Sequence, residues 1–544
     1  MKSLSWIDIV SILVFLIFTI TYALKKSKNK DAAGYFLSGK SENWFVVGLS
    51  LFAASVSSST LIGHSGEGFI SGIAVFNYNI GAVFVIVFVA LFFLPFYIKT
   101  GIYTIPGYLE RRYDRRSSVY FSFITIIGNV FLDAAAALYT GALILKVIFP
   151  EVDTIYVIWI MAAIAGFYTI VGGLSSAIYA DIIHTIVLII GSIFLAFFCI
   201  HTIGGWEEFM HRFDDGVWMS LIRPANDPTM PWIAILISLP ILGFYFWGNN
   251  QVMVQRVLSA KSIDQGRKGV LFVAFIYLFT LFIFIMPGII ARGINLFGVD
   301  LPKSIISGDT LRNVYNVNTN EVYPRLIMKL MPVGMMGLIL AAMVSALTSA
   351  LSATLNSVST LFTMDFYRKM NPKADSQKLV RVGQITSFVV LVIAVLWSPM
   401  IGRFASLVSY YQEFVSYLAP PIVSAFLLGL FWKRSNAHGA FAGLMVGIAT
   451  AATIMTLKFG FDIKVPIHFL MWAPILLVLS SLVNVVVSFS TGKPDPIKVS
   501  ENTWNRKLLT DDFKEQKNTP WYKNFYMLSI LLVIAAIIEY IIFW

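Results

Sequence analysis

Long apolar runs, separated by short polar segments, occupy most of this 544-residue chain. Fourteen of the runs are long enough to cross the ~30 Å hydrocarbon core of a bilayer as helices. They span residues 5–25, 44–73, 77–98, 118–148, 154–176, 180–202, 231–256, 268–296, 323–366, 377–397, 404–432, 438–457, 466–490 and 523–543. The pattern predicts an all-α, polytopic membrane protein with about 14 transmembrane helices in a single domain, 1–544.

Two of these runs are interrupted by polar residues at membrane depth. The second run contains a hydroxyl cluster at Ser55–Thr60, and the seventh contains GFYFWGNNQ at Gly243–Gln251. Backbone groups freed by such an interruption are tolerated only where they face protein or a water-filled cavity. Close helix packing through small residues is the alternative explanation for either interruption alone.

The spacing of the two interruptions predicts an internal repeat. The interruptions lie five spans apart, so their two segments cross the membrane in opposite directions. This is typical of two five-helix repeats with inverted topology, each beginning with a broken helix. We expect these repeats at 44–202 and 231–432, with a peripheral first helix at 5–25. Peripheral C-terminal helices are expected at 438–543, with a cytosolic linker at 491–522.

The placement of basic residues predicts the orientation of the chain. Its formal net charge is +11, and 28 of its 40 basic residues fall in the connections that follow odd-numbered spans. By the positive-inside rule these connections are cytosolic, which places both termini outside. Because the basic residues are spread over many short loops, no nucleic-acid partner is expected.

The composition argues against several other classes of protein. With 58% hydrophobic and 13% charged residues, the chain is not a soluble globule. The single cysteine, Cys199, excludes a disulfide framework and a cysteine-based metal site. No catalytic Ser/His/Asp set, phosphate loop or metal-binding spacing stands out, so an enzyme is not expected. The first run ends at Lys25 and Lys26 without a small-residue cleavage site, and we expect it to be retained.

Polar residues in three other spans are candidates for binding. The segment Ala341–Ser357 carries Ser345, Thr348, Ser349, Ser352 and Asn356 at helical spacing, for which close packing of small residues is the alternative. Asp133 and Asp181 are acids within or at the edge of apolar runs, where ionisable groups are usually functional. Helix capping is the alternative for Asp181. We expect His64 and His184 to be packing histidines.

Six stretches of the chain resemble the sodium–solute symporter family, in its sodium/glucose cotransporter branch. They are YFLSGKSENWFVVGLSLFAAS, YIKTGIYTIPGYLERRY, FYTIVGGLSSAIYADIIHT, QVMVQRVLSAKS, LNSVSTLFTMDFY and YLAPPIVSAFLLGLFWKR. The resemblance covers nearly the whole chain. It implies a LeuT-type fold of five plus five helices, in agreement with the two interruptions.

The resemblance also implies a sodium site between the first broken helix and the span that carries the hydroxyl stripe. The ligands it implies are the carbonyl oxygens of Ala53, Val56 and Ala346 and the hydroxyl of Ser349. Ala350 stands where the family usually has a second serine, so one oxygen is missing, and Thr348 or a water is the candidate to replace it. A second sodium site would use Asp181 and Ser352, and Ala353 leaves that site incomplete.

The solute positions implied by the resemblance combine aromatic, amide and hydroxyl groups. They are Ser55, Thr60, Tyr78, Asn79, Asp133, Phe246, Trp247, Tyr277 and Gln412. Phe246 replaces a gate tyrosine of the family, Asn79 a glutamate and Tyr277 a lysine. Asp133 stands in the place of an asparagine and would repel an anionic solute at low dielectric. We therefore expect a small neutral polyhydroxylated solute, with an amine-bearing solute as the alternative.

Together these features predict a secondary active transporter of the plasma membrane that imports a sugar or polyol with sodium by alternating access. Its expected partners are the solute, sodium and the lipid bilayer, and we expect a monomer or a weak homodimer. Proton coupling is the alternative to sodium coupling, because Ala350 removes one oxygen and acids lie in the membrane. A membrane sensor with a transporter-like core is the other class left open.

Overall fold

The computed structural model of the chain is helical, with no β-strand among its described residues. These residues are 4–26, 40–56, 58–100, 104–148, 151–213, 216–302, 304–305, 308–401, 407–461, 463, 467–505, 513–514, 516 and 519–544. Some features singled out in the sequence lie partly outside them, among them Ser57 of the hydroxyl cluster, the first residues of the stretch that begins YFLSGK and part of the linker expected at 491–522.

The helices of the first half of the chain lead from the first broken helix to a long continuous one. In chain order they are α1 (Trp6–Lys26), α3 (Trp44–Ser55), α4 (Ser58–Ser71), η2 (Gly72–Phe76), α5 (Asn77–Phe92), α6 (Leu94–Thr100), α7 (Ile105–Arg112), α8 (Arg115–Gly128), η3 (Asn129–Ala134), α9 (Ala135–Ile148), α10 (Thr154–Ile203) and α11 (Trp206–Arg212).

The helices of the second half begin with the second broken helix. They are α12 (Trp232–Gly243), η4 (Phe244–Asn249), α13 (Gln251–Val257), α14 (Ile263–Leu278), η5 (Leu281–Ile285), α15 (Met286–Gly293), α16 (Gly308–Asn313), η6 (Thr319–Glu321), α17 (Val322–Leu330), α18 (Met335–Leu361), η7 (Phe362–Tyr367), α19 (Arg368–Met370), α20 (Ser376–Ile401), α21 (Leu407–Phe431), α22 (Ala437–Met455), η8 (Thr456–Gly460), η9 (Phe469–Met471), α23 (Trp472–Ser490), α24 (Pro496–Asn502) and α26 (Phe525–Ile542).

The number of spans differs from the number expected. In the described part of the chain, 11 helices are long and apolar enough to cross a membrane, or up to 12 if the bent pair of α14 with η5 and α15 forms one span. The prediction of fourteen spans is therefore not confirmed. One reason is α10, which is continuous over 50 residues where two spans were expected. A straight helix of that length would measure ~75 Å, far more than the ~30 Å of hydrocarbon.

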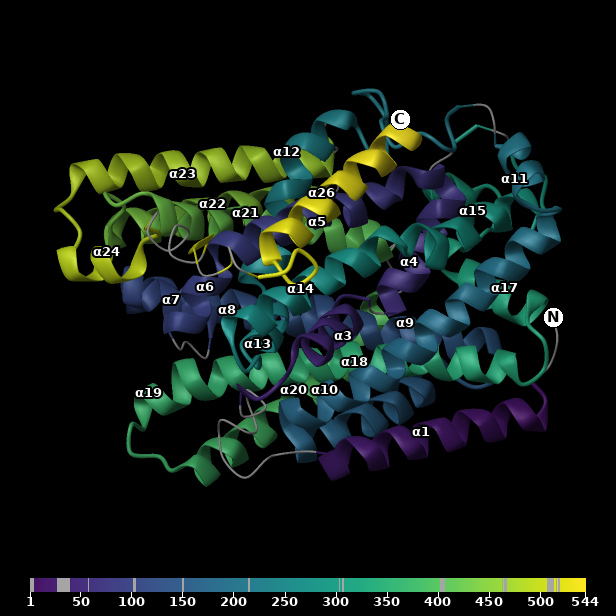
Figure 1. The fold of residues 1–544 in the computed structure, drawn as a ribbon, viewed down its shortest axis with the longest axis horizontal. Coiled ribbons are helices and arrows are strands. Elements are labelled where there is room, and N and C mark those ends of the chain that lie inside the picture. The colour runs from purple at the N-terminus through teal and green to yellow at the C-terminus, as the bar shows by residue number, and fades with distance from the viewer. Residues whose placement is uncertain are drawn as a thin grey trace.

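Helix α18 lies at the centre of the molecule. It is buried along almost its whole length, and α10, α3, α9 and α20 pack around it. Four helices, α1, α22, α23 and α26, instead leave most of their apolar surface exposed. Figure 1 shows α1 along the lower edge of the molecule and α22 and α23 at the upper left. A buried central helix and apolar outer helices are what a bundle surrounded by lipid requires. The division into two inverted repeats stays a prediction.

The first predicted interruption is a break between α3 and α4. Val56, which follows α3, leaves the helical region with φ −97° and ψ 77°, and its N–H still donates to the Phe52 carbonyl at 2.8 Å. The Ser55 hydroxyl donates to the same carbonyl at 2.9 Å, and the Thr60 hydroxyl donates to the Ser55 carbonyl at 3.1 Å. The Thr60 hydroxyl therefore supplies a donor to a backbone oxygen at the break, whereas the Ser55 hydroxyl shares a carbonyl that keeps its helical partner.

The second predicted interruption lies between α12 and α13. Helix α12 contains Pro240 and continues into η4, a wide turn of π-helix. This turn is followed by Asn250, whose backbone is extended. The Asn250 side chain then caps α13 by accepting from the Val252 N–H at 2.8 Å. Proline, the π-turn and the asparagine cap together account for the break.

Candidate solute and sodium site

A cavity of about 190 Å³ lies between the two breaks. All nine positions expected to contact the solute line it. Ser55 and Thr60 come from the first break, Tyr78 and Asn79 from α5, Asp133 from η3, Phe246 and Trp247 from η4, Tyr277 from α14, and Gln412 from α21. The tertiary structure thus gathers side chains from six segments around one space. Their role in binding stays a prediction.

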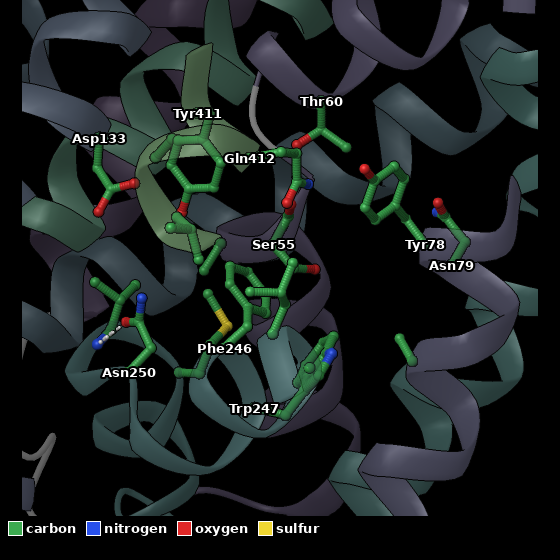
Figure 2. Close-up of a pocket in the computed structure, with 18 of the residues that line it drawn as sticks. Ser55, Thr60, Tyr78, Asn79, Asp133, Phe246, Trp247, Asn250, Tyr411 and Gln412 are labelled. Carbon is green, nitrogen blue, oxygen red and sulfur yellow. Dashed lines mark hydrogen bonds between the residues drawn. The ribbon is translucent and has the colours of Figure 1, made fainter. Parts of the chain in front are cut away.

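The cavity has two polar ends. In Figure 2, Asp133 and Tyr411 lie on one side of the space and Tyr78 and Asn79 on the other, with Gln412 and Thr60 between them. The Tyr411 and Asp133 side chains are neighbours at their end of the cavity. Asp133 reaches the cavity from the π-helix η3, one of the wide turns that often occur at functional sites.

Aromatic rings form one wall of the cavity. The Trp247 ring lies edge-on to Tyr277, with 5.4 Å between ring centroids, and to Phe246, with 5.3 Å between centroids. Phe52 packs edge-on against Tyr277 from behind, at 6.1 Å. Rings locked against one another in this way present a rigid apolar surface to a bound solute.

Ionisable side chains are few in the cavity wall. Among the described residues of the wall, Asp133 is the one acid, and none is a lysine or an arginine. A solute with a carboxylate would meet Asp133 at short range without a basic side chain to neutralise it. The wall therefore favours neutral or cationic solutes.

The residues expected to hold sodium lie beside the first break. Ala53 lies in the last turn of α3, and Val56 follows this helix. Helix α3 packs against α18, which carries Ala346 and Ser349. The hydroxyl of Ser352, one turn beyond Ser349, is buried and has no hydrogen-bond partner among the described residues. Carbonyl and hydroxyl oxygens of this kind suit a hard cation, so the donor set fits sodium. These ligands stay a prediction.

Asp181 is engaged by protein groups. Its carboxylate pairs with the Arg256 guanidinium at 2.8 Å, and both side chains are almost fully buried. The Ser50 hydroxyl donates to the same carboxylate oxygen at 3.2 Å, and the Ser349 hydroxyl donates to the other one. Because the Ser349 proton points to Asp181, the lone pairs of this hydroxyl are available to a cation. Asp181 itself already has a positive partner, which was not expected from the sequence.

Several residues of the cavity wall were not expected from the sequence. They are Ala54, His64, Ala82, Leu132, Leu239, Leu242, Gly243, Asn250, Val252, Met253, Ala350, Thr354, Leu407, Tyr411 and Val415. His64 was expected only to pack, yet it lies one helical turn beyond Thr60 and faces the same space. Thr354 lies one turn beyond Ala350, and Tyr411 is adjacent to Gln412. Helical spacing from positions already chosen could have identified His64 and Thr354.

A cavity between two broken helices, inside a bundle of apolar helices, is the arrangement in which many secondary transporters bind their solute. The sodium:solute symporter family model matches residues 35–447. Sodium/glucose cotransporter 1 of Oryctolagus cuniculus is 31% identical over 87% of this chain and 77% of the relative. The sodium/myo-inositol cotransporter of Canis lupus familiaris is 32% identical over 92% of this chain and 76% of the relative.

A solved structure of a Na⁺-coupled sialic acid symporter, substrate-bound and outward-open, shares the fold with a TM-score of 0.77. It is 22% identical and covers 90% of this chain and 99% of its own. The chain belongs to the sodium:solute symporter family. It is therefore a sodium-coupled membrane transporter and not an enzyme.

Proposed function

We propose that the chain imports a small neutral polyhydroxylated solute, a sugar or polyol, across the plasma membrane in symport with sodium. Transport proceeds by alternating access around the cavity between the two breaks, and one chain, as a monomer or in a weak homodimer, is the transport unit. The observation that carries this proposal is the composition of the cavity wall. Amide, hydroxyl and carboxylate groups surround a rigid aromatic face, and no lysine or arginine is among the described residues that line the cavity.

Hydroxyl-rich solutes match this wall in two ways. Asp133 offers carboxylate oxygens to solute hydroxyls, and a carboxylate accepts stronger hydrogen bonds than a neutral group does. Trp247 and Tyr277 offer an apolar surface for the C–H face of a ring. Relatives named as glucose and myo-inositol cotransporters support the same class of solute.

Uptake into proteoliposomes tests the proposal. D-glucose, D-galactose, myo-inositol, linear polyols and small amines are offered with an inward sodium gradient and again with choline replacing sodium. We expect uptake of one polyol or sugar only when sodium is present. Uptake that is equal in the two conditions, or that follows a pH gradient without sodium, would refute sodium coupling of that solute.

Asp133 also favours a second candidate, a solute with a protonated amine. A buried carboxylate in a wall without basic side chains would stabilise an ammonium group by charge. Uptake of an amine in preference to every neutral polyol of the panel would select this candidate.

A further inference from the structure

His64 lies in the cavity wall, and a neighbouring carbonyl determines which of its two ring nitrogens carries the proton. Its Nδ1 lies 2.9 Å from the Thr60 carbonyl oxygen, and a carbonyl only accepts hydrogen bonds. The proton of the neutral imidazole therefore resides on Nδ1, and Nε2 is left as an acceptor. The ring is held edge-on between Phe284, at 5.7 Å, and Tyr78, at 6.4 Å.

Asn79, beside His64, has its amide orientation set by the same kind of reasoning. The Thr280 hydroxyl donates its one proton to the Tyr277 carbonyl at 2.6 Å. It can therefore only accept from Asn79, whose Nδ2 donates to it at 3.0 Å. This leaves Asn79 Oδ1, a buried acceptor with no partner among the described residues.

His64 and Asn79 thus lie next to each other at the end of the cavity that Figure 2 shows at Tyr78 and Asn79. Asn79 Oδ1 is buried without a hydrogen-bond partner that meets the usual geometry among the described residues, and Asn79 is the polar side chain beside the His64 ring. A buried acceptor without a donor, such as Asn79 Oδ1, is costly, at roughly 1–3 kcal/mol in proteins. A ligand that brings donors to this end would remove that cost.

We propose that His64 is a specificity-determining residue that accepts a hydrogen bond from a solute hydroxyl, together with Asn79 Oδ1. The inference rests on the proposed polyol symport and adds to it a second recognition point, across the cavity from Asp133. The solute presents free hydroxyls at both ends. Analogues in which the hydroxyl at the His64 end is missing or methylated lose the donor and are rejected.

Paired measurements on side chain and solute test this inference. The parent solute is the member of D-glucose, D-galactose and myo-inositol that the wild type takes up best, and each of its monodeoxy analogues is compared with it. We expect the wild type to discriminate strongly against one of these analogues. His64→Leu should raise the KM of the parent roughly 10- to 100-fold and remove that discrimination, since the acceptor is gone.

Two further variants separate recognition from packing. His64→Gln, whose amide oxygen can accept, should recover part of the affinity for the parent. His184→Leu removes another buried histidine, packed against Phe15 outside the cavity, and should leave discrimination unchanged. The sodium concentration for half-maximal uptake should stay the same in all three variants.

The outcomes distinguish the two proposals. If His64→Leu raises the KM of the parent and of every analogue by the same factor, or leaves discrimination intact, His64 is not a recognition residue. If the wild type takes up no member of the polyol panel with sodium, the proposed function fails first, before any variant is compared, and the inference fails with it.

Discussion

Hydroxyl protons at the first break are directed to the chain itself. Ser55 donates to the Phe52 carbonyl, and Thr60 donates to the Ser55 carbonyl. In the proposed site their oxygens would therefore meet a solute chiefly as acceptors, as would the carboxylate of Asp133 and the amide oxygen of Asn79. At the scale of single residues the site is matched to a solute rich in donors, which is why loss of one acceptor should change solute choice.

The first prediction at this scale concerns Asp133. Asp133→Asn should raise the KM of the transported solute roughly 10-fold or more, because a charged acceptor becomes neutral. The sodium concentration for half-maximal uptake should change little, since the expected sodium ligands lie beside the break. The measurement is uptake at varied solute and at varied sodium.

Asp365→Asn is the matched control for that change. This buried carboxylate accepts from Thr104 at 2.8 Å and from Ser122 at 2.7 Å, outside the cavity. It should leave the ranking of solutes intact. An Asp133→Asn transporter with altered sodium dependence and unaltered solute choice would move Asp133 out of solute recognition.

The second prediction at this scale concerns Ala350. Ala350→Ser should add the missing oxygen and lower the half-maximal sodium concentration roughly three- to tenfold, equivalent to ~0.7–1.4 kcal/mol. Sodium titration of uptake is the measurement. Ala342→Ser, a hydroxyl added two turns away on the same buried helix, is the control and should have no such effect. Unchanged sodium affinity in Ala350→Ser would argue against the expected ligand set.

At the scale of elements, the half-helix α4 is fitted closely to α15. A Cβ atom added to Gly288 would lie 1.9 Å from the Ser65 carbonyl oxygen, and one added to Gly68 would lie 2.6 Å from the Ile285 carbonyl oxygen. Backbone atoms cannot move aside as a flexible side chain can. These glycines hold the second half of the first broken helix against its neighbour.

Gly288→Ala should therefore destabilise the protein by ~1–3 kcal/mol or more, as overpacking does. The thermal unfolding midpoint of the purified protein in detergent is the measurement. Gly81→Ala, at a glycine with no atom within 4 Å of the added Cβ, is the control and should keep the midpoint unchanged or raise it. Equal midpoints for Gly288→Ala and the wild type would show that α4 and α15 separate readily.

The pair of Asp181 and Arg256 joins four helices. Asp181 lies in α10, Arg256 in α13, Ser50 in α3 and Ser349 in α18, and the network connects segments of both expected repeats. Removing one partner leaves the other charge buried and uncompensated.

Arg256→Gln should lower the free energy of unfolding by ~3–5 kcal/mol, because Asp181 loses its counter-charge in a buried site. Asp181→Asn/Arg256→Gln removes both charges and should recover a substantial part of the loss. Thermal unfolding of wild type, both single variants and the double variant forms the cycle. Additive losses would show that the two side chains do not depend on each other.

At the scale of the whole molecule, one sodium ion supplies enough free energy for accumulation. An elementary charge crossing 100 mV contributes ~2.3 kcal/mol, and a tenfold sodium gradient adds ~1.4 kcal/mol. Together they sustain a roughly 500-fold gradient of a neutral solute. The expected second sodium site lacks the hydroxyl that Ala353 replaces, and Asp181 is paired with Arg256.

We therefore expect one sodium ion to move with each solute molecule. The reversal potential of solute-coupled current in proteoliposomes, measured at several solute gradients, reports the ratio directly. A slope that corresponds to two sodium ions for each solute would refute the expectation, and would assign a second ion to the network around Asp181.

The local pattern of apolar and polar residues predicted much of the fold, but it did not predict the number of spans. Apolar length predicts helices, and the clusters at Ser55–Thr60 and Gly243–Gln251 correctly marked both breaks, because freed backbone groups need polar partners nearby. The loop expected between 176 and 180 is absent, since α10 continues through it. Whether two apolar runs join into one helix depends on the packing around the junction, which apolar length does not encode.

The sequence by itself determined the class of protein, the two breaks and the types of side chain available to a solute. Only the tertiary structure decided which of these side chains meet. It brought nine expected positions around one cavity, and it placed His64, expected only to pack, in the cavity wall. It also paired Asp181 with Arg256, 75 residues away in the chain. The physical reason is that apolar patterning and backbone polarity act along the chain, whereas hydrogen-bond and ion-pair partners are chosen by proximity in space.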